Sequence, residues 1–388
     1  MCCYTRICDS WRKAIDDKKL AGILLVDLSK AFDSLPHSLT IAKLHAYGVS
    51  ENALTLIADY LTNRSQRTKV CSAVSDWSSL SKGVPQGSII GPVLFNVFMN
   101  DIFYAIKNNT LFNYADDNTL LATGNSLAET IETLKNGCDN ILNWVHTNEM
   151  EANPSKFQVM LSNDSNVPFK INDDVTITSE ACVKLLGVFL DNKLTFNDHI
   201  THLCTKAAKQ INVLQRLKRM LDPDVKLLLY KAFISCHFNY CPVVWHACGA
   251  VNTRKLEKLQ YRALKFVFND HSSTYDELLT KANMPTLEIS RLRSLALEVF
   301  KALNHVSPSF ICDIFKENVR THRYNLRGNA LIHSHSRTTR FGLHSFNHLG
   351  VSVWNSLPVH FRETTDFNTF KGLIKTWYGN SCRCSFCS

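Results

Sequence analysis

The sequence predicts an α+β fold, because strand-like and helical segments both occur in it. Residues 22–26 are a short apolar run of the buried-strand type, and residues 112–121 are an apolar run that a polar turn interrupts, the pattern of a hairpin. Residues 93–106 form an apolar helical run, and apolar side chains recur every three or four residues from Ile200 to Leu221. With 388 residues and 45% hydrophobic content, the chain can form two or three domains with proper cores.

Three carboxylates lie at the ends of these predicted strands. Asp27 directly follows residues 22–26, and Asp116 and Asp117 occupy the polar turn of the hairpin. Neighbouring acids raise each other's pKa, and a bound divalent cation commonly stabilises their negative charges. The turn therefore indicates a Mg²⁺ site. A solvated turn, which Asp favours for conformational reasons, and a strand-end cap at Asp27 are the simpler interpretations.

A bent segment separates the two strand regions. Residues 82–92 contain three glycines and two prolines immediately before the helical run that starts at Val93. Gly87 leaves room for a ligand to approach the main chain, so this bend is a candidate binding loop.

Charge is distributed unevenly along the chain. The formal net charge of +9 combines −4 in residues 1–195 with +13 in residues 196–388. Phosphate backbones favour such an asymmetry through counterion release, so the second part is the candidate nucleic-acid-binding part. A positive net charge also fits a ribosomal or membrane-surface protein.

Three helices are predicted in the basic part. Asn197 or Asp198 caps the first helix, whereas Asp222 at the N-cap and Pro223 at the first helical position start the second. The third helix runs from Arg254 to Phe268. Basic side chains lie largely off the apolar face of the first helix and recur on the third.

The segments around Asp27, Gln86 and Asp116 resemble, in this order, motifs A, B and C of reverse transcriptases, and they are most similar to the non-LTR (LINE-type) retrotransposon family. Residues 144–157 resemble motif D, and residues 183–188 resemble the motif E hairpin. Five motifs in the family's order make chance agreement hard to credit. The resemblance implies a polymerase palm, an antiparallel sheet packed on helices, with incomplete fingers, a helical thumb and a small C-terminal region.

The same resemblance implies a division into domains. Residues 1–195 would be the reverse transcriptase palm with remnant fingers, residues 196–275 the helical thumb, and residues 276–388 a basic region of unknown role. In that last region, residues 323–327 and 337–354 could bind a single strand by stacking and charge, or could form a small core with a basic surface.

The catalytic centre follows from the resemblance. Asp27 and Asp116 would be bridging metal ligands, with Leu28 beside them and Asp117 as the supporting acid. Two Mg²⁺ ions would be the cofactors, and Mn²⁺ could replace them. Lys156 would protonate the leaving pyrophosphate, although a surface lysine on a turn explains it almost as well.

The nucleotide-binding residues are implied in the same way and comprise Leu28, Phe32, Gln86 and Gly87. Phe32 would be a steric gate against the sugar 2′ position, which favours deoxynucleotides. Gln86 would contact the incoming nucleotide through its amide. The simpler interpretation of Phe32 is a core residue, and the simpler interpretation of Gln86 is a turn residue with a solvated amide.

The primer and template contacts complete the implied site. Leu185, Leu186 and Gly187 would form the primer grip. The thumb would close over the wide minor groove of an RNA/DNA hybrid, although charged faces on an ordinary helical bundle would look the same. Its expected basic contacts are Lys206, Lys209, Arg216, Lys218, Arg219, Lys258 and Arg262. The partners are then an RNA template, a DNA primer, their hybrid and deoxynucleoside triphosphates.

Fourteen scattered cysteines and the lack of a signal peptide favour reduced thiols in an intracellular protein of the nucleus or cytoplasm, not a secreted one. Two clusters could bind zinc, although neither has a zinc-finger spacing. They are Cys236, Cys241, His246 and Cys248, and Cys382, Cys384 and Cys387. Residues 89–106 approach the length of a membrane span, but their polar residues favour a buried helix, so no membrane partner is expected.

Two functions remain open at this point. The chain is an RNA-directed DNA polymerase that uses Asp27, Asp116 and Asp117, or it is a catalytically inactive relic of a truncated retroelement that only binds nucleic acid. Intact metal ligands favour the polymerase. The relic is favoured because only about twenty residues precede motif A, which predicts an N-terminal truncation that removes most of the fingers.

Overall fold

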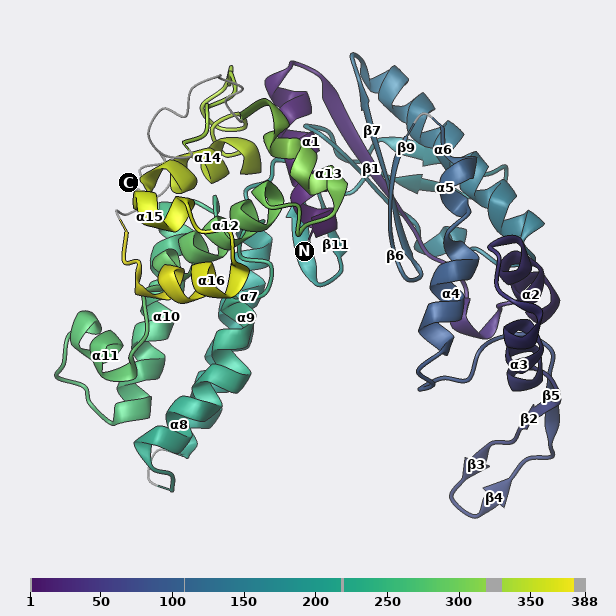
Figure 1. Cartoon of the computed structure of the whole chain (residues 1–388), viewed down its shortest axis with the longest axis horizontal. Coiled ribbons are helices and arrows are strands. Elements are labelled where there is room, and N and C mark those ends of the chain that lie inside the picture. Colours follow the sequence, from purple (N-terminus) through teal and green to yellow (C-terminus); the bar gives the residue numbers. More distant parts are fainter. Residues whose placement is uncertain (1, 108, 218–219, 319–329, 380–388) are drawn as a thin grey trace. The chain divides into compact units, whose positions relative to one another are not determined.

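The computed structural model describes residues 2–107, 109–217, 220–318 and 330–379, and it divides into two compact units (Figure 1). The sheet unit comprises residues 19–186, and the helical unit comprises residues 1–18 and 187–388. The sheet unit therefore ends at Leu186, whereas the predicted palm ends at residue 195. The predicted functional domains stay a prediction.

The sheet unit is built on a four-stranded antiparallel sheet with the strand order β6-β7-β1-β8. The strands β1 and β7 lie in the middle, and both are largely buried. The predicted strand and the predicted hairpin are therefore confirmed. The bounds of the four strands are β1 (Leu20–Val26), β6 (Thr110–Tyr114), β7 (Asp117–Gly124) and β8 (Gln158–Leu161).

One long helix, α6 (Leu127–Thr147), packs on β1 and β7. The Ser126 side chain accepts a hydrogen bond from the Glu129 N–H and so caps the helix. Gly22 on β1 permits close contact, because a Cβ there would lie 2.8 Å from the side chains of Leu134 and Leu161. The other helices of the unit are α2 (His37–Ala46), α3 (Glu51–Leu61), α4 (Gly91–Met99) and α5 (Ile102–Ala105).

The single helix predicted over residues 93–106 is wrong, because the chain forms α4 and α5 with a break between them. Asp101 lies at the break, where its carboxylate accepts hydrogen bonds from Lys43 Nζ at 2.8 Å and from Trp144 Nε1 at 3.1 Å. Both helices contribute to the core beneath the sheet, as expected for a buried segment. The break between α4 and α5 thus coincides with Asp101, whose hydrogen-bond partners lie far away in the sequence.

A long hairpin extends from the end of α3, well away from the four-stranded sheet (Figure 1). It consists of β2 (Arg64–Gln66), β3 (Lys69–Val70), β4 (Ala73–Val74) and β5 (Ser78–Leu80), where β2 pairs with β5 and β3 with β4. We call residues 62–80 the hairpin arm. The remaining elements of the unit are η1 (Ala31–Asp33), η2 (Pro154–Lys156), β9 (Pro168–Lys170), β10 (Thr176–Thr178) and β11 (Cys182–Leu185).

In its described residues, the helical unit contains most of the helices and one short strand. Its N-terminal part is α1 (Cys2–Asp16), and the strand is β12 (Val188–Asp191). The three helices predicted for the thumb correspond to α7 (Asn197–Arg216), α8 (Pro223–Leu229) and α10 (Ala250–Phe268). Directly after α8 the chain forms η3 (Tyr230–Ser235, a π-helical turn) and α9 (Cys236–Phe238). The helices that follow are α11 (Tyr275–Ala282), α12 (Leu287–Leu303), α13 (Ser309–Cys312), η4 (Asp313–Asn318), α14 (Phe346–Ser356), α15 (Val359–Arg362) and α16 (Phe367–Thr376).

The helix starts agree only in part with the predictions. Asp222 and Pro223 occupy the N-cap and the first helical position of α8, as predicted. The cap predicted for α7 is wrong, because Phe196 in a left-handed conformation (φ 59°) is the N-cap and Asn197 is already helical. The Phe196 ring is fully buried, so packing of that ring outweighs the usual preference for a polar cap.

The N-terminal helix α1 packs against α13 and α14 within the helical unit. Its apolar face, which includes Trp11, is buried. Two of its acids tie it to distant backbone: Asp9 accepts from the Phe346 N–H at 2.7 Å, and Asp16 accepts from the Thr338 N–H at 2.7 Å. The segment predicted as a remnant of the fingers thus contributes to the core of the helical unit.

The C-terminal helices share one apolar core in which Phe346 and Trp354 are 4% and 2% exposed. These two rings are therefore not accessible for stacking with a single strand, and the small-core interpretation holds for them. Residues 323–327 lie outside the described residues. In the described part of the chain, no helix combines the length and the apolar character needed to cross a membrane.

The first of the two clusters that could bind zinc is not arranged as a metal site. Cys236 is exposed, whereas Cys241 and Cys248 are buried, and in the described ranges no three His, Cys, Asp or Glu side chains are arranged to hold a metal ion. The second cluster, Cys382, Cys384 and Cys387, lies outside the described residues.

Candidate active site

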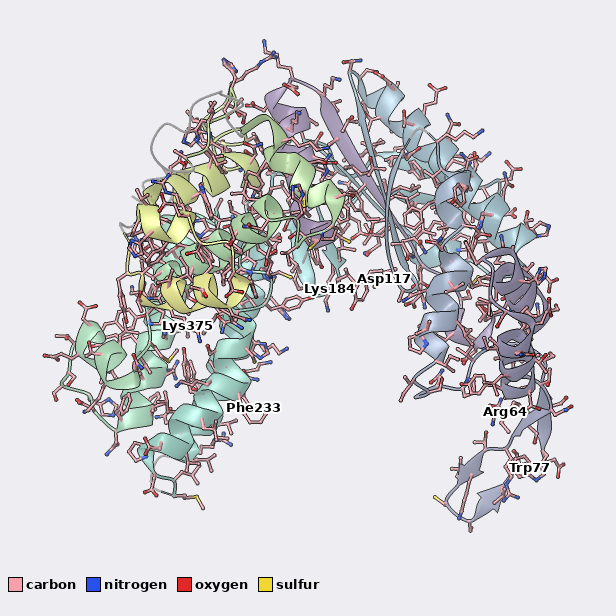
Figure 2. All side chains as sticks on the ribbon, viewed as in Figure 1. Arg64, Trp77, Asp117, Lys184, Phe233 and Lys375 are labelled. Atoms are coloured by element: carbon pink, nitrogen blue, oxygen red, sulfur yellow. The ribbon has the colours of Figure 1, made fainter. Side chains whose placement is uncertain are left out.

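The three predicted metal ligands come together at one edge of the sheet. β1 and β7 pair with Val26 opposite Asn118, so Asp27, which follows Val26, and Asp117, which precedes Asn118, lie at the same end of these two strands. The hairpin turn places Asp116 next to Asp117, at the tip where β6 and β7 meet. Figure 2 shows Asp117 at this end of the sheet. Sheet register thus brings Asp27 beside two acids that lie about ninety residues later in the sequence.

The electrostatics at this edge favour a cation. Partial burial raises the pKa of Asp117, and the negative charges of Asp116 and Asp27 raise it further. Asp117 thus lies within Coulombic reach of both other acids, although no cluster of three acids in the described residues has the close arrangement of a metal site. Hard carboxylate oxygens that repel one another are a suitable donor set for Mg²⁺.

A pair of asparagines holds the acidic turn. Asn113 and Asn118 face each other across the hairpin, and the Asn113 Nδ2 donates to the Asn118 Oδ1 at 3.0 Å. The same Nδ2 donates to the Ala115 carbonyl at 2.8 Å, while the Asn118 Nδ2 donates to the Asp116 carbonyl at 3.0 Å. Ala115 has a left-handed backbone (φ 53°), which is costly for a residue with a Cβ. We call Asn113 and Asn118 the asparagine pair.

The segment around Lys156 is attached to the strand end that carries Asp27. The Asn153 N–H donates to the Asp27 carbonyl at 3.0 Å, and the Ser29 N–H donates to the Glu151 carbonyl at 2.8 Å. Lys156 follows on the short helix η2, and its Nζ lies 3.6 Å from Asp27 Oδ2. The structure thus places the predicted lysine at the acidic edge of the sheet. Because the Leu28 side chain is buried, that residue can face a ligand only through its backbone.

The binding loop predicted at residues 82–92 is joined to the segment after Asp27. The Gly83 N–H donates to the Leu35 carbonyl at 2.7 Å, and the Val84 N–H donates to the Phe32 carbonyl at 2.9 Å. Gly83 has φ +88°, and a Cβ there would lie 2.7 Å from the Asp33 carbonyl oxygen. Only glycine fits this contact between the two segments.

A pocket of about 330 Å³ lies where these two segments meet. Its lining comprises Phe32, Val84, Pro85, Gln86, Gly87, Gly91 and Pro92, so it includes three of the four predicted nucleotide-binding residues. The Phe32 ring stacks on Phe95 with the ring centroids 4.4 Å apart. The Gln86 Nε2 donates to Asp33 Oδ1 at 3.1 Å, so an aspartate holds the predicted nucleotide-binding amide. Gly87 has φ +84°, and no atom lies within 4 Å of the position that a Cβ would take, so its backbone is open.

The predicted primer grip is a tight turn. Leu185 ends β11 with a buried side chain, Leu186 and Gly187 have left-handed backbones (φ 37° and φ 89°), and Val188 begins β12. A hairpin is therefore confirmed at the predicted position. Its contact with a primer stays a prediction.

The predicted basic thumb residues that the structure describes are exposed on two helices that pack against each other. Lys206, Lys209 and Arg216 lie on α7, and Lys258 and Arg262 lie on α10. An Arg262 nitrogen donates to Asn212 Oδ1 at 2.8 Å and so links the helices. Lys218 and Arg219 lie outside the described residues.

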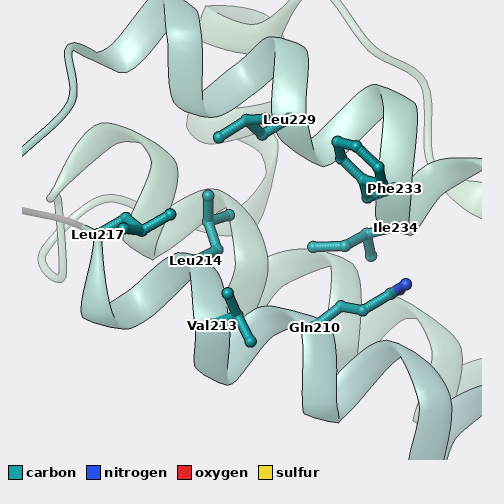
Figure 3. A pocket seen from close by; sticks show the side chains of 7 residues that line it. All are labelled: Gln210, Val213, Leu214, Leu217, Leu229, Phe233 and Ile234. Carbon is teal, nitrogen blue, oxygen red and sulfur yellow. The ribbon is translucent and has the colours of Figure 1, made fainter. Parts of the chain in front are cut away.

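A second pocket lies in the same helical region. It has a volume of about 280 Å³ and an almost wholly apolar lining between α7 and the segment formed by α8 and η3. Figure 3 shows Val213 and Leu214 from one side facing Leu229 and Phe233 from the other. It has no group that could take part in catalysis.

An antiparallel sheet with three acids at one edge, beside a glycine-lined pocket, defines the palm of a nucleic-acid polymerase. Residues 5–190 match the reverse transcriptase (RNA-dependent DNA polymerase) family. Residues 5–190 are therefore a reverse transcriptase domain, and the chain is similar to the RNA-directed DNA polymerases of non-LTR retrotransposons, as its motifs predicted.

Known proteins of mobile elements are similar to this chain. A probable RNA-directed DNA polymerase from transposon BS of Drosophila melanogaster is 26% identical over 66% of this chain and 30% of its own length. The RNA-directed DNA polymerase from mobile element jockey of Drosophila funebris is 26% identical over 65% of this chain and 29% of its own length. The chain thus spans about 30% of the length of these relatives.

One solved structure with a weak similarity is telomerase from Candida albicans. It is 11% identical, covers 75% of this chain and 50% of its own chain, and has a TM-score of 0.35. This similarity is too low to support an argument about the site.

Sequence reasoning missed the residues that hold the predicted ones in place. The asparagine pair and Asp33 were not predicted, although Asn113 and Asn118 flank the two-residue turn Ala115–Asp116 symmetrically in the sequence Asn-Tyr-Ala-Asp-Asp-Asn. That symmetry is the signal that could have found them, because residues at equal distances from a two-residue turn face each other across a hairpin.

Proposed function

We propose that this chain is an RNA-directed DNA polymerase of a non-LTR retroelement, which extends a DNA primer on an RNA template. The observation that supports the proposal most directly is the β1–β7 register, in which Val26 faces Asn118, so that Asp27 and Asp117 lie at the same end of the two strands. Partial burial and the charges of Asp116 and Asp27 raise the pKa of Asp117, so a bound cation would stabilise its ionised carboxylate, which favours the polymerase over an inactive relic.

Asp27, Asp116 and Asp117 would hold the divalent cations, with the Leu28 backbone beside them. Two Mg²⁺ ions bound there would activate the primer 3′-hydroxyl and stabilise negative charge on the triphosphate. The asparagine pair fixes the turn that carries Asp116, because it ties the carbonyls of Ala115 and Asp116 to the hairpin. Lys156, whose Nζ lies 3.6 Å from Asp27 Oδ2, would donate its Nζ proton to the leaving pyrophosphate.

The pocket lined by Phe32, Gln86 and Gly87 would receive the deoxynucleotide. The Phe32 ring, backed by Phe95, would exclude a 2′-hydroxyl by steric clash. The Gln86 amide would exchange its bond with Asp33 for a sugar or phosphate oxygen of the nucleotide. The turn at Leu186 would support the primer end.

The exposed basic side chains of α7 and α10 would hold the RNA/DNA hybrid by its backbone. Such contacts recognise the shape and charge of the duplex and no base sequence. Hybrid binding is therefore expected to weaken steeply with salt and to depend little on sequence.

Primer extension on poly(rA)/oligo(dT) with Mg²⁺ and dTTP tests the proposal. The variant Asp116→Asn/Asp117→Asn should lose extension. A matched control is Asp173→Asn/Asp174→Asn, which makes the same change in an exposed pair of acids in the sheet unit and should extend like the wild type. If the wild type and both variants fail to extend the primer but bind the hybrid in a salt-sensitive way, the polymerase is rejected and a nucleic-acid-binding protein remains.

A further inference from the structure

We propose that the hairpin arm, residues 62–80, binds single-stranded nucleic acid through a cationic and aromatic face built around Arg67 and Trp77. Under the proposed function, this single strand is the unpaired RNA template. The inference rests on the proposed function only for the identity of the strand. The arm lies in the sheet unit, and nothing in the proposed catalytic chemistry uses it. Figure 2 shows Arg64 and Trp77 on the arm, which extends beyond the helices of the unit.

The arm is an ordered hairpin with a defined register. β2 and β5 pair with Gln66 opposite Ser78, so the next residues, Arg67 and Trp77, face each other. The Arg67 guanidinium lies 4.6 Å from the centre of the Trp77 ring. Between this pair and the tip, the Thr68 N–H donates to Ser75 Oγ at 2.9 Å, and the Ser75 N–H donates to the Thr68 carbonyl at 2.9 Å.

The pairing shifts by one residue along the arm. Gln66 faces Ser78 before the shift, and Lys69 faces Val74 after it, so one extra residue near Asp76 forms a bulge. A bulge increases the local twist and redirects side chains, and it is common next to functional sites. It lies directly beside the Arg67–Trp77 stack.

The base of the arm repeats the same chemistry. The Arg64 Nε donates to the Tyr60 carbonyl at 2.9 Å, and its guanidinium lies 5.2 Å from the Tyr60 ring. Two guanidinium groups of the arm thus lie over aromatic rings, that of Arg64 over Tyr60 on α3 and that of Arg67 over Trp77 on the arm. A stacked guanidinium keeps its N–H edge free for a phosphate, and its rigid position lowers the entropy cost of binding.

The protein itself buries none of this surface. All side chains from Thr62 to Ser79 are exposed, and Trp77 is 63% and Val70 65% exposed. A two-stranded hairpin without a buried face is marginally stable in water, so large apolar side chains on both of its strands indicate a binding partner. The exposed indole leaves ring surface on which a base can stack.

The charge of the arm identifies the kind of partner. Arg64, Arg67 and Lys69 are opposed by one acid, Asp76, although residues 1–195 as a whole carry a net charge of −4. In the described part of the chain, no carboxylate forms an ion pair with these three basic residues. A partner must therefore be anionic and must also present flat apolar faces. Single-stranded nucleic acid has both properties, whereas the bases of a duplex are already stacked.

Binding of fluorescein-labelled oligo(rU) to the 388-residue chain, measured by anisotropy in EDTA, tests the inference. The variant Arg67→Ala/Trp77→Ala should raise Kd by about tenfold or more, since stacking of one base contributes on the order of 1–3 kcal/mol. The slope of log K against log salt should fall by about 0.7 for each phosphate that the variant no longer binds. Because both side chains are exposed, the variant should fold like the wild type, and its circular dichroism spectrum checks this.

The matched control is Tyr104→Ala/Lys170→Ala, which removes an exposed aromatic ring and an exposed cation elsewhere in the same unit. It should bind like the wild type. Oligo(dU) should bind through the same stack, and a duplex should compete poorly. Wild-type affinity in the arm variant, an equal loss in the control, or strong competition by duplex would overturn the inference.

The outcome is independent of the catalytic chemistry. The oligo(rU) assay is run in EDTA and needs no bound metal, so it measures the arm separately from primer extension. A protein without primer extension but with arm-dependent binding would reject the proposed function and retain the arm. A protein with extension but without arm-dependent binding would reject the arm alone.

Discussion

Removal of the Asn118 side chain should loosen the turn that carries Asp116 and Asp117. Asn118 is 1% exposed, donates to the Asp116 carbonyl at 3.0 Å and accepts from Asn113 Nδ2 at 3.0 Å. Each such hydrogen bond contributes about 1 kcal/mol net to stability. Asn118→Ala loses two of them, so the free energy that opens the hairpin should fall by about 2 kcal/mol.

Asn113 completes a double-mutant cycle. Its Nδ2 donates to the Ala115 carbonyl at 2.8 Å and to Asn118 at 3.0 Å, so Asn113→Ala also loses two bonds. The double variant loses three bonds, because the two residues share one. We therefore expect losses of about 2, about 2 and about 3 kcal/mol, with a coupling energy of about 1 kcal/mol.

Hydrogen exchange of the peptide that covers residues 110–124 measures these losses locally, in EDTA and without nucleic acid. A loss of about 2 kcal/mol should accelerate exchange by about 30-fold, and a loss of about 3 kcal/mol by about 150-fold. Asn96→Ala, at an exposed position on α4, should leave this peptide unchanged. Wild-type protection in the single variants, or a double variant whose loss equals the sum of the single losses, would refute the reasoning.

Three further predictions concern other parts of the structure. Burial lowers the pKa of His199 to about 4, and the charge of His202 adds to the shift. The helical unit should therefore lose up to about 3 kcal/mol of unfolding free energy as the pH falls from 6.5 to 4. If the urea midpoint of His199→Gln depends on pH as strongly as that of the wild type, this prediction is wrong. Gly83→Ala should destabilise the sheet unit more than Gly87→Ala does in urea unfolding, because both replace a left-handed glycine but a Cβ at Gly83 alone meets backbone, at 2.7 Å from the Asp33 carbonyl. Phe32→Ala should raise ribonucleotide incorporation relative to deoxynucleotide by about tenfold or more in a competition assay, and an unchanged ratio would show that Phe32 is a core residue only.

The strands at the acidic edge could be predicted because their signals are local. An apolar run that ends in one acid, and an apolar run broken by Asp116 and Asp117, each indicate a strand without knowledge of the rest of the chain. The motifs then placed Asp27 with them, since no local signal gives the register between β1 and β7. The structure supplies that register through the pairing of Val26 with Asn118.

The features that could not be predicted depend on partners far apart in the sequence. The break after α4 follows from Asp101, which accepts hydrogen bonds from Lys43 and Trp144. The placement of α1 depends on Asp9 and on backbone groups more than 300 residues later. Hydrophobic periodicity reports which face of a helix is buried and not which segment covers it.

The predicted cap of α7 failed for a related reason. Asn197 and Asp198 have the side chains preferred at an N-cap, but Phe196 takes that position because its ring is buried in the core. Local preferences of about 1 kcal/mol are easily outweighed by burial of a large aromatic ring.

The most direct test of the central claim is single-turnover incorporation of dTMP on poly(rA)/oligo(dT) by variants of the three acids. If Asp27, Asp116 and Asp117 act as one metal-binding unit, Asp27→Asn and Asp116→Asn should each cost nearly as much rate as Asp27→Asn/Asp116→Asn, because either loss disables the unit. The exposed control Asp174→Asn should keep the wild-type rate. Wild-type incorporation by either single variant, or multiplicative losses in the double variant, would contradict the account.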